Sequence, residues 1–343
     1  MTTARPAHTP ARHPAAAVAG APPSPWPSRL LQVVIVTAAV LGILWLFGNV
    51  IDNMRARGMQ AGFGFLLEPA GFEIGESVLA FDASQPFWRA FLAGLANTLR
   101  VVLPALLLAT VIGFAVGIAR LSPALPVRAL ATAYVELFRN VPLLLQLLMW
   151  YFVLTTLLPV SSEALQPLPG VFLSKSGLVL PWIVDGAVSW PVLEGFGIDG
   201  GVALTPEFVA VCLGLSVGTA AFIAEAVRGG IQSVPRGQVD AGRAIGLPPA
   251  GVLRFIVLPQ ALKAIVPPLG NQYLNLLKNS SLAVAIGYPD LVSIANTSMN
   301  QTGRAFECVA VLMAVYLALS LLVAGVLGLF NRRVALRGTG ART

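Results

Sequence analysis

Long apolar runs, each about 20 residues in length and with few or no charges, recur along the chain. A helix rising about 1.5 Å per residue needs roughly this length to cross a hydrocarbon core of about 30 Å. The composition agrees with this reading, because 56% of the residues are apolar and 11% are charged. The sequence therefore predicts an all-α fold, a polytopic bundle of about six membrane-spanning helices.

The predicted spans fall at about 30–50, 97–119, 129–160, 208–224, from 264 onward, and 309–330. A tail rich in Ala and Pro precedes the first span and shows no apolar periodicity, which indicates disorder. We divide the chain into a disordered tail at 1–28, an added span with an external segment at 29–92, a core at 93–332 and a basic tail at 333–343.

An insertion at 161–206 separates the third and fourth spans. Its longest apolar stretch, 177–184, is too short to cross a bilayer and contains Pro181. We expect a folded or surface-lying external segment.

The distribution of basic residues predicts the orientation, because Lys and Arg resist translocation. Segment 1–29 holds three basic and no acidic residues, and the tail after 331 holds four basic and no acidic residues. Segment 225–263 holds five basic and two acidic residues. Acidic residues outnumber basic ones in the other two segments, with five against three in 51–90 and four against one in 161–206. Six spans with both termini in the cytoplasm satisfy these counts. The net charge of +7 thus reports topology and does not indicate a nucleic-acid partner.

The predicted internal loop at 225–263 contains a short segment bounded by turn-forming residues. Pro235 and Gly237 are suited to begin a helix, and Gly246 with Pro248 is suited to end it. A helix of about two or three turns cannot span a membrane. Joined directly to spans, it is suited to receive movement from a soluble partner.

This loop resembles the cytoplasmic loop of ABC importer permeases, which reads Glu-Ala-Ala, three residues, Gly, nine residues, Ile-x-Leu-Pro. The chain has the same spacing, with Asp and Gly in place of Glu and the second Ala, in Asp240-Ala241-Gly242, Gly246 and Ile256-Val257-Leu258-Pro259. The resemblance implies a type I permease fold in a bacterial inner membrane. It also implies that residues 238–247 dock on the ATPase, with the coupling residues Gly237, Asp240, Ala241, Gly242, Gly246 and Pro259.

The same resemblance implies several partners. They are ATP-binding cassette ATPase subunits, a second permease subunit that forms a homodimer or heterodimer, and an extracytoplasmic amino-acid-binding protein.

Three further stretches resemble the polar amino acid branch of the family: Asn97-Thr98-Leu99, Phe138-Arg139-Asn140-Val141-Pro142 with Gln146, and Leu277-Lys278-Asn279-Ser280-Ser281-Leu282. Asn140-Val141, Asn279 and Ser280 depart from that branch.

The fifth predicted span carries polar residues on one helical face. Asn271, Asn275 and Lys278 follow at i, i+4 and i+7, and Ser281 lies one turn further. A charge within a span must face a cavity or a partner, so these four residues are candidates for the translocation path. The alternative is that Lys278 extends outward or pairs at a subunit interface. At the start of the third span, Glu136 and Arg139 are expected to pair with each other.

Several chemistries have no signature in the sequence. There is no phosphate-binding loop, so we expect no cofactor in this chain and ATP bound by a partner subunit. No cluster of metal ligands is evident, and we expect no metal and no enzymatic activity. Two other classes stay open, an ion-gradient-driven secondary transporter of amino acids and a membrane scaffold that recruits a cytosolic ATPase.

Overall fold

The computed structural model describes residues 26–56, 62–184 and 186–336. The chain divides into two units, Met1–Ala61 and Gly62–Thr343. In the first unit, helix α1 covers Trp26–Ala56, and its apolar part, Leu30–Leu46, is exposed throughout. The predicted disordered tail lies outside the described residues, except for residues 26–28, which begin α1.

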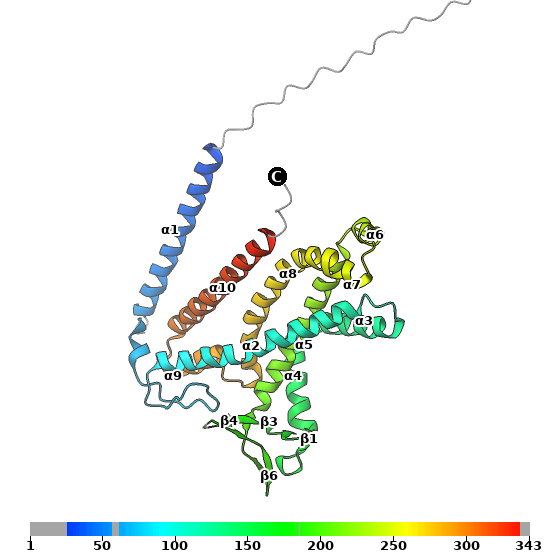
Figure 1. Cartoon of the computed structure of the whole chain (residues 1–343). Coiled ribbons are helices and arrows are strands. Elements are labelled where there is room, and N and C mark those ends of the chain that lie inside the picture. The colour runs from blue at the N-terminus through cyan, green and yellow to red at the C-terminus, as the bar shows by residue number, and fades with distance from the viewer. Residues whose placement is uncertain (1–25, 57–61, 185, 337–343) are drawn as a thin grey trace, which may run out of the picture. The chain divides into compact units, whose positions relative to one another are not determined.

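Helices form most of the second unit (Figure 1). The long ones are α2 (Phe87–Ala119), α5 (Pro206–Gln232), α8 (Leu258–Asn279) and α10 (Ala305–Leu336). The shorter ones are α3 (Leu125–Asn140), α4 (Leu143–Phe152), α6 (Arg236–Ala244), α7 (Pro249–Val252) and α9 (Leu291–Thr302). Single 3-10 or π turns complete them, namely η1 (Phe63–Leu67), η2 (Val153–Leu157), η3 (Ser161–Glu163), η4 (Leu253–Val257) and η5 (Ser280–Ile286).

Four described helical segments are long and apolar enough to cross a membrane, and a bent pair provides a fifth candidate. They are Phe87–Ala119, Pro206–Gln232, Pro249–Ile286 and Ala305–Leu329, with Leu125–Asn140 and Leu143–Leu157 as the pair. The third predicted span is therefore broken, with a bend of 106° between its halves. Pro142 explains the break, because the residue before a proline is disfavoured in helical conformation.

The fifth predicted span begins earlier than expected. Helical structure runs from Pro249 through the π turn η4 into α8, about 15 residues before the predicted start at 264. Helix α9, which the sequence did not predict, follows it. The side chain of Asp290 caps α9 by accepting a hydrogen bond from the backbone N–H of Ser293 at 2.8 Å.

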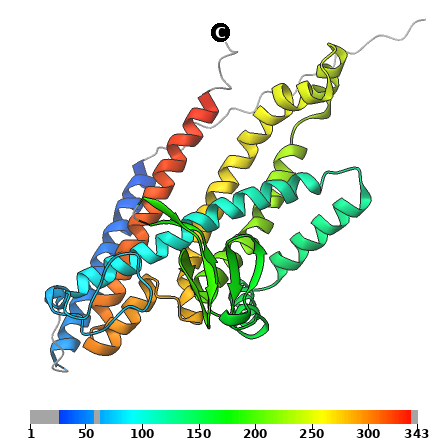
Figure 2. The same ribbon diagram turned by 60° about the horizontal axis from the view of Figure 1, so that its bottom comes forward.

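The insertion at 161–206 is built largely of short β-strands, so the predicted all-α class is too narrow. Eight strands follow one another in antiparallel pairs: β1 (Leu165–Leu168), β2 (Val171–Ser174), β3 (Gly177–Leu180), β4 (Trp182–Val184), β5 (Ala187–Ser189), β6 (Val192–Glu194), β7 (Gly197–Asp199) and β8 (Val202–Leu204). One sheet has the order β1-β2-β3-β8, and β4-β5 and β6-β7 are separate hairpins. Figure 1 shows the strands at one end of the helices, where β8 leads into α5, and Figure 2 brings that end forward.

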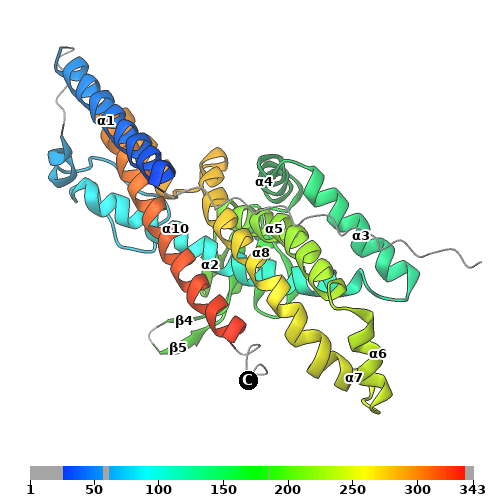
Figure 3. The same cartoon turned by 90° about the horizontal axis from the view of Figure 1, so that it is seen from above.

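Helix α5 is the most buried of the candidate spans and packs against α2, α4 and α8 (Figure 3). Glycines make these contacts close. A Cβ on Gly113 of α2 would come within 2.6 Å of Ile223, and one on Gly214 of α5 within 2.5 Å of Leu147. Small residues therefore bring these helices together, as they commonly do in membranes.

The segment Gly62–Pro86, called the external strap below, folds back across the ends of several helices. Its Phe65 is fully buried against Phe87. At one end, the backbone N–H of Gly62 donates to Glu307 at 2.9 Å, and Arg304 donates to the Gly62 carbonyl at 2.8 Å. Glu307 lies in the first turn of α10 and Arg304 directly precedes this helix, so the beginning of the strap is held at the start of the last described helix.

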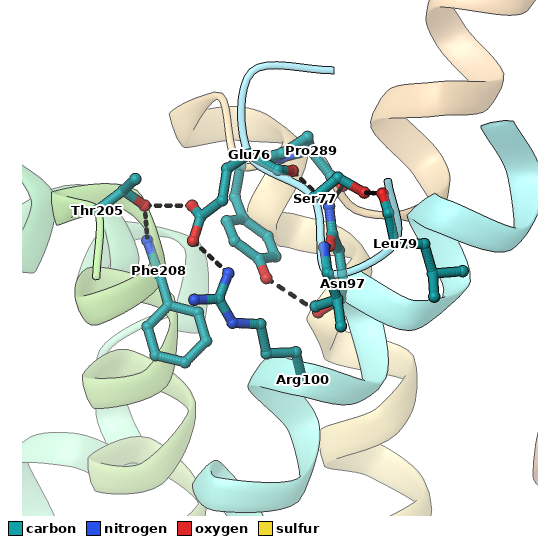
Figure 4. A network of polar contacts seen from close by, with 10 residues as sticks. Glu76, Ser77, Leu79, Asn97, Arg100, Thr205, Phe208 and Pro289 are labelled. Atoms are coloured by element: carbon teal, nitrogen blue, oxygen red, sulfur yellow. Dashed lines mark hydrogen bonds and ion pairs between the residues drawn. The ribbon is translucent and has the colours of Figure 1, made fainter. Parts of the chain in front are cut away.

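Glu76 fixes the middle of the strap in the network of Figure 4. Its carboxylate forms an ion pair with Arg100 of α2 and accepts a hydrogen bond from Thr205, which also caps α5. The amide of Asn97 donates to the carbonyls of Glu76 and Pro289 at 2.8 and 2.9 Å. One carboxylate and one amide thus join the strap to the first half of α2, to the N-cap residue of α5 and to the loop before α9.

We predict that Gly113→Ala destabilises the protein, whereas Gly325→Ala does not. The added methyl at 113 meets Ile223, and overpacking of about 1–3 kcal/mol exceeds the roughly 0.5–1 kcal/mol that alanine gains in a helix. Nothing lies within 4 Å of a Cβ at Gly325, so that site is a matched control. Thermal unfolding of the detergent-purified protein measures both, and equal midpoints would contradict the packing described.

Candidate coupling helix and polar cavity

Helix α6 stands at the end of α5 remote from the β-strands (Figure 1). Pro235 caps its start, and the helix ends before Gly246, as the turn residues predict. Asp240 and Arg243 are 71% and 67% exposed, with 3.8 Å between their charged atoms, and such surface pairs contribute little to stability. The large apolar Ile245 is 77% exposed. The helix therefore offers both charged and apolar side chains to a partner.

Gly246 ends α6 in a left-handed conformation with φ of 84°. The Gly246 N–H donates to the Arg243 carbonyl at 2.9 Å, and the Leu247 N–H donates to the Gly242 carbonyl at 3.1 Å. This pair of hydrogen bonds is a Schellman motif, which requires a residue that tolerates positive φ. The motif therefore has glycine at position 246 because the backbone there needs a residue that tolerates positive φ. Nothing lies within 4 Å of a Cβ placed there.

Gly242 is the buried residue of α6, and it explains why the motif has a small residue at this position. A Cβ on Gly242 would lie 2.3 Å from Cδ1 of Ile256, in η4. Pro259 follows in the first turn of α8, where a missing backbone N–H costs least. The Gln260 side chain donates to that of Gln238 at 3.1 Å. Helix α6 is therefore packed directly on the helical segment that continues as α8.

An ion cluster joins the ends of α2 and α5 close to α6. Glu225 of α5 pairs with Arg120 at the end of α2 and with Arg228 one turn along α5. Arg228 also donates to Gln232, the last residue of α5. Residues 233–235 then link this end of α5 to α6.

A cavity of about 460 Å³ lies between α3, α4, α5 and α8. Its polar lining comes from Arg139, Asn140, Gln146, Thr219, Gln272, Asn275 and Asn279. Gly218 of α5 lies in its wall, about 18 Å from the first residue of α5 and about 21 Å from the last at 1.5 Å per residue. The cavity is therefore near the middle of the span, and its volume falls within the range of small-molecule sites.

The predicted path residues of α8 face two different depressions. Asn275 lines the polar cavity, together with Gln272 and Asn279, two residues that the sequence reasoning did not select as path residues. Lys278 and Ser281 line a second depression of about 310 Å³ beside α9 and α10. Asn271 is exposed on α8. Residues on one face of a helix point in a similar direction, but the neighbouring helices determine which cavity each side chain lines.

The expected pairing of Glu136 with Arg139 does not occur among the described residues. Both lie near the end of α3, beside the break, and not at the start of a span. The guanidinium of Arg139 lies over the ring of Phe222, with 5.4 Å from Cζ to the ring centroid. Arg100, which belongs to α2, pairs with Glu76 of the strap.

The long apolar helices, the cavity between them and the exposed helix at one end define a membrane permease. The chain belongs to the family described as binding-protein-dependent transport system inner membrane component, whose model matches residues 109–336. The resemblance found in the loop motif is thereby confirmed.

Named relatives match along most of the chain. A putative amino-acid ABC transporter permease, YhdX of Escherichia coli K12, is 39% identical over 90% of this chain and 94% of its own length. The general L-amino acid transport permease AapQ of Rhizobium johnstonii is 37% identical over 90% and 92%. A crystal structure of an amino acid ABC transporter with histidines aligns with a TM-score of 0.55, 28% identity and coverage of 72% and 95%. An inward-facing structure of the methionine transporter MetNI, at 20% identity and a TM-score of 0.51, shares the fold.

We predict that Gly242→Leu displaces α6 from η4, because the new side chain would occupy the position of Ile256. Gly237→Leu is the matched control, since nothing lies within 4 Å of a Cβ at Gly237. Disulfide cross-linking of Gln238→Cys with Gln260→Cys reports the displacement. The cross-link should fall with Gly242→Leu and persist with Gly237→Leu, and unchanged cross-linking in both would refute the contact.

Proposed function

We propose that this chain is the permease subunit of an ATP-driven importer of polar amino acids. Its family and the names of its relatives support the class of transporter and the class of substrate. The observation that carries the mechanism is α6, an exposed helix closed by a glycine turn and packed on the segment that leads into α8. Residues 238–247 form the docking element for the ATPase.

The coupling residues act in three ways under this proposal. Asp240, Ala241 and Ile245 are exposed and meet the ATPase. Gly242 and Pro259 keep α6 seated on the membrane helices, Gly246 permits the turn at its end, and Gly237 leaves the first turn of α6 without a side chain toward the ATPase. Closure of the ATPase on ATP moves α6, and the Glu225 cluster passes that movement to α2 and α5.

The remaining partners follow from the same proposal. ATP is bound by separate ATPase subunits, because the sequence has no phosphate-binding loop. An external binding protein delivers the amino acid. The distribution of basic residues supports an orientation with both termini and α6 in the cytoplasm and with the strap and the β-strands outside the inner membrane.

A second permease subunit covers the exposed polar face of α8. Asn271, Asn275 and Lys278 are exposed within this chain although they belong to a spanning helix. Polar groups in a span face a cavity or a partner, because lipid offers them no hydrogen bonds. The face that holds these residues and Ser281 would therefore border a translocation path between two permeases, identical or not.

We predict that Gly246→Val abolishes coupling while leaving membrane insertion intact. A β-branched residue at φ of 84° is strained by about 1–2 kcal/mol or more, so the Schellman turn would open and α6 would reorient. Uptake of radiolabelled L-glutamine into proteoliposomes that contain ATP, the complete transporter and its binding protein should fall by about tenfold or more.

Gly246→Asn is the control, because asparagine tolerates the left-handed conformation. Its uptake should stay close to that of the unmodified protein. Full ATP-driven uptake by Gly246→Val would overturn the proposed coupling role. Uptake without ATP would favour a secondary transporter, and no uptake by the unmodified complex would favour a scaffold.

We further predict that Lys278→Ala lowers the initial rate of uptake by about tenfold, the change that about 1.4 kcal/mol in the barrier produces. Under this proposal, loss of the ammonium group removes the charge on the exposed polar face of α8. Lys263→Ala is the control, since Lys263 is exposed near the beginning of the same helix. A normally assembled Lys278→Ala transporter with unchanged uptake would exclude Lys278 from the path.

A further inference from the structure

Gln146 fixes the corner between α3 and α4, where Arg139 and Asn140 lie. Its side chain is 3% exposed, and its Nε2 donates hydrogen bonds to the carbonyls of Phe138 and Val141, both at 2.9 Å. These carbonyls flank Arg139 and Asn140 in the sequence. Both amide hydrogens are used, which settles the orientation of the amide. Gln146 therefore positions the corner that brings Arg139 to the polar cavity.

The other end of this amide is unsatisfied. Gln146 Oε1 is buried and has no hydrogen-bond partner among the described residues. A Cβ on Gly218 would lie 2.9 Å from it, so the glycine makes room for the amide in the cavity wall. A buried acceptor without a partner costs about 1–3 kcal/mol. A hydrogen-bond donor on a molecule bound in the cavity would offset that cost.

The lining of the cavity carries a positive charge that no acidic residue of the lining balances. Arg139 is its charged residue, and none of its lining residues, all within the described part of the chain, is Asp or Glu. The other polar groups are the Thr219 hydroxyl and five side-chain amides, in Asn140, Gln146, Gln272, Asn275 and Asn279. Guanidinium groups bind carboxylates through paired hydrogen bonds, and side-chain amides offer both donors and acceptors. The cavity thus suits a ligand that carries carboxylate and amide groups.

We propose that this cavity selects amino acids with acidic or amide side chains and rejects those with cationic side chains. A carboxylate of the ligand lies at Arg139, and its ammonium group faces the amide oxygens, including that of Gln146. This inference rests on the proposed transport of amino acids and adds the class of side chain. It assigns Arg139 and Asn275 to selection and Gln146 to positioning.

Rejection of cationic ligands follows from the cost of burying charge. A second positive charge near Arg139 would meet no carboxylate in the lining and would lose its hydration in the middle of the span. Like charges in a site of low dielectric repel strongly. A neutral amide side chain avoids both costs, and an acidic one gains a partner.

The test is direct binding to the complete permease and ATPase complex in lipid nanodiscs, without the binding protein, so that only the cavity selects. Radiolabelled L-glutamine, L-glutamate and L-arginine are the probes. We expect L-arginine to bind about tenfold or more weakly than L-glutamine, a difference of about 1.4 kcal/mol. Equal or tighter binding of L-arginine would overturn the proposal, and so would a lack of binding by all three probes.

Asn275→Asp is the decisive variant, because it places a carboxylate in the cavity lining without changing the size of the side chain. The ratio of L-arginine to L-glutamate affinity should rise by about tenfold or more. Asn300→Asp is the matched control, since Asn300 is exposed on α9 and is not part of that lining. No change with Asn275→Asp, or an equal change with both variants, would refute selection by this cavity.

Gln146→Met tests the positioning role. Methionine has a side chain of similar length but cannot donate to the two carbonyls, and it adds no charge to the cavity lining. Affinity for L-glutamate should fall more than affinity for L-glutamine, because Arg139 is no longer held in place. An equal loss for both ligands would reduce Gln146 to a structural role. ATP-driven uptake by the unmodified transporter is measured separately, so failure of selection is distinguished from failure of the importer assignment.

Discussion

The close contact of α5 with α2 and α4 is the constraint on which the rest of this structure depends. In a bilayer, apolar side chains gain little by leaving lipid, so helices must associate through short-range packing. Gly113 and Gly117 of α2 meet α5, and Gly214 and Gly218 of α5 meet α4. These contacts leave α5 buried on most sides. A helix held in this way transmits displacement along its length because it has little freedom to bend aside.

Both functional regions take their position from α5. Near its middle, Gly218 admits the Gln146 amide and so shapes the wall of the polar cavity. At its end, Glu225 and Arg228 tie it to α2 just before α6 begins. The region proposed to recognise the substrate and the region proposed to receive force therefore share one rigid element.

Local turn chemistry made α6 predictable from the sequence, whereas tertiary contacts decided the features that sequence reasoning missed. Pro235 and Gly246 bound α6 because their backbone preferences act on their own residues. Pro142 and Asp290 are also local signals, for the break between α3 and α4 and for the start of α9. The long apolar run around Pro142 concealed the first of these two signals. Strands of three or four residues are too short for periodicity to predict. The separation of Asn275 from Lys278 depends on α4 and α10, which a helical projection does not contain.

The external strap has a consequence for the order in which the protein is made. Phe65 and Gly62 belong to the first quarter of the chain, yet Gly62 is held by Glu307, 245 residues later. During synthesis the strap must wait until α10 has been inserted before its amide and aromatic groups find their places. Closure of the strap thus marks completion of the bundle, and a chain halted before α10 would leave an aromatic surface uncovered for chaperones or proteases to recognise.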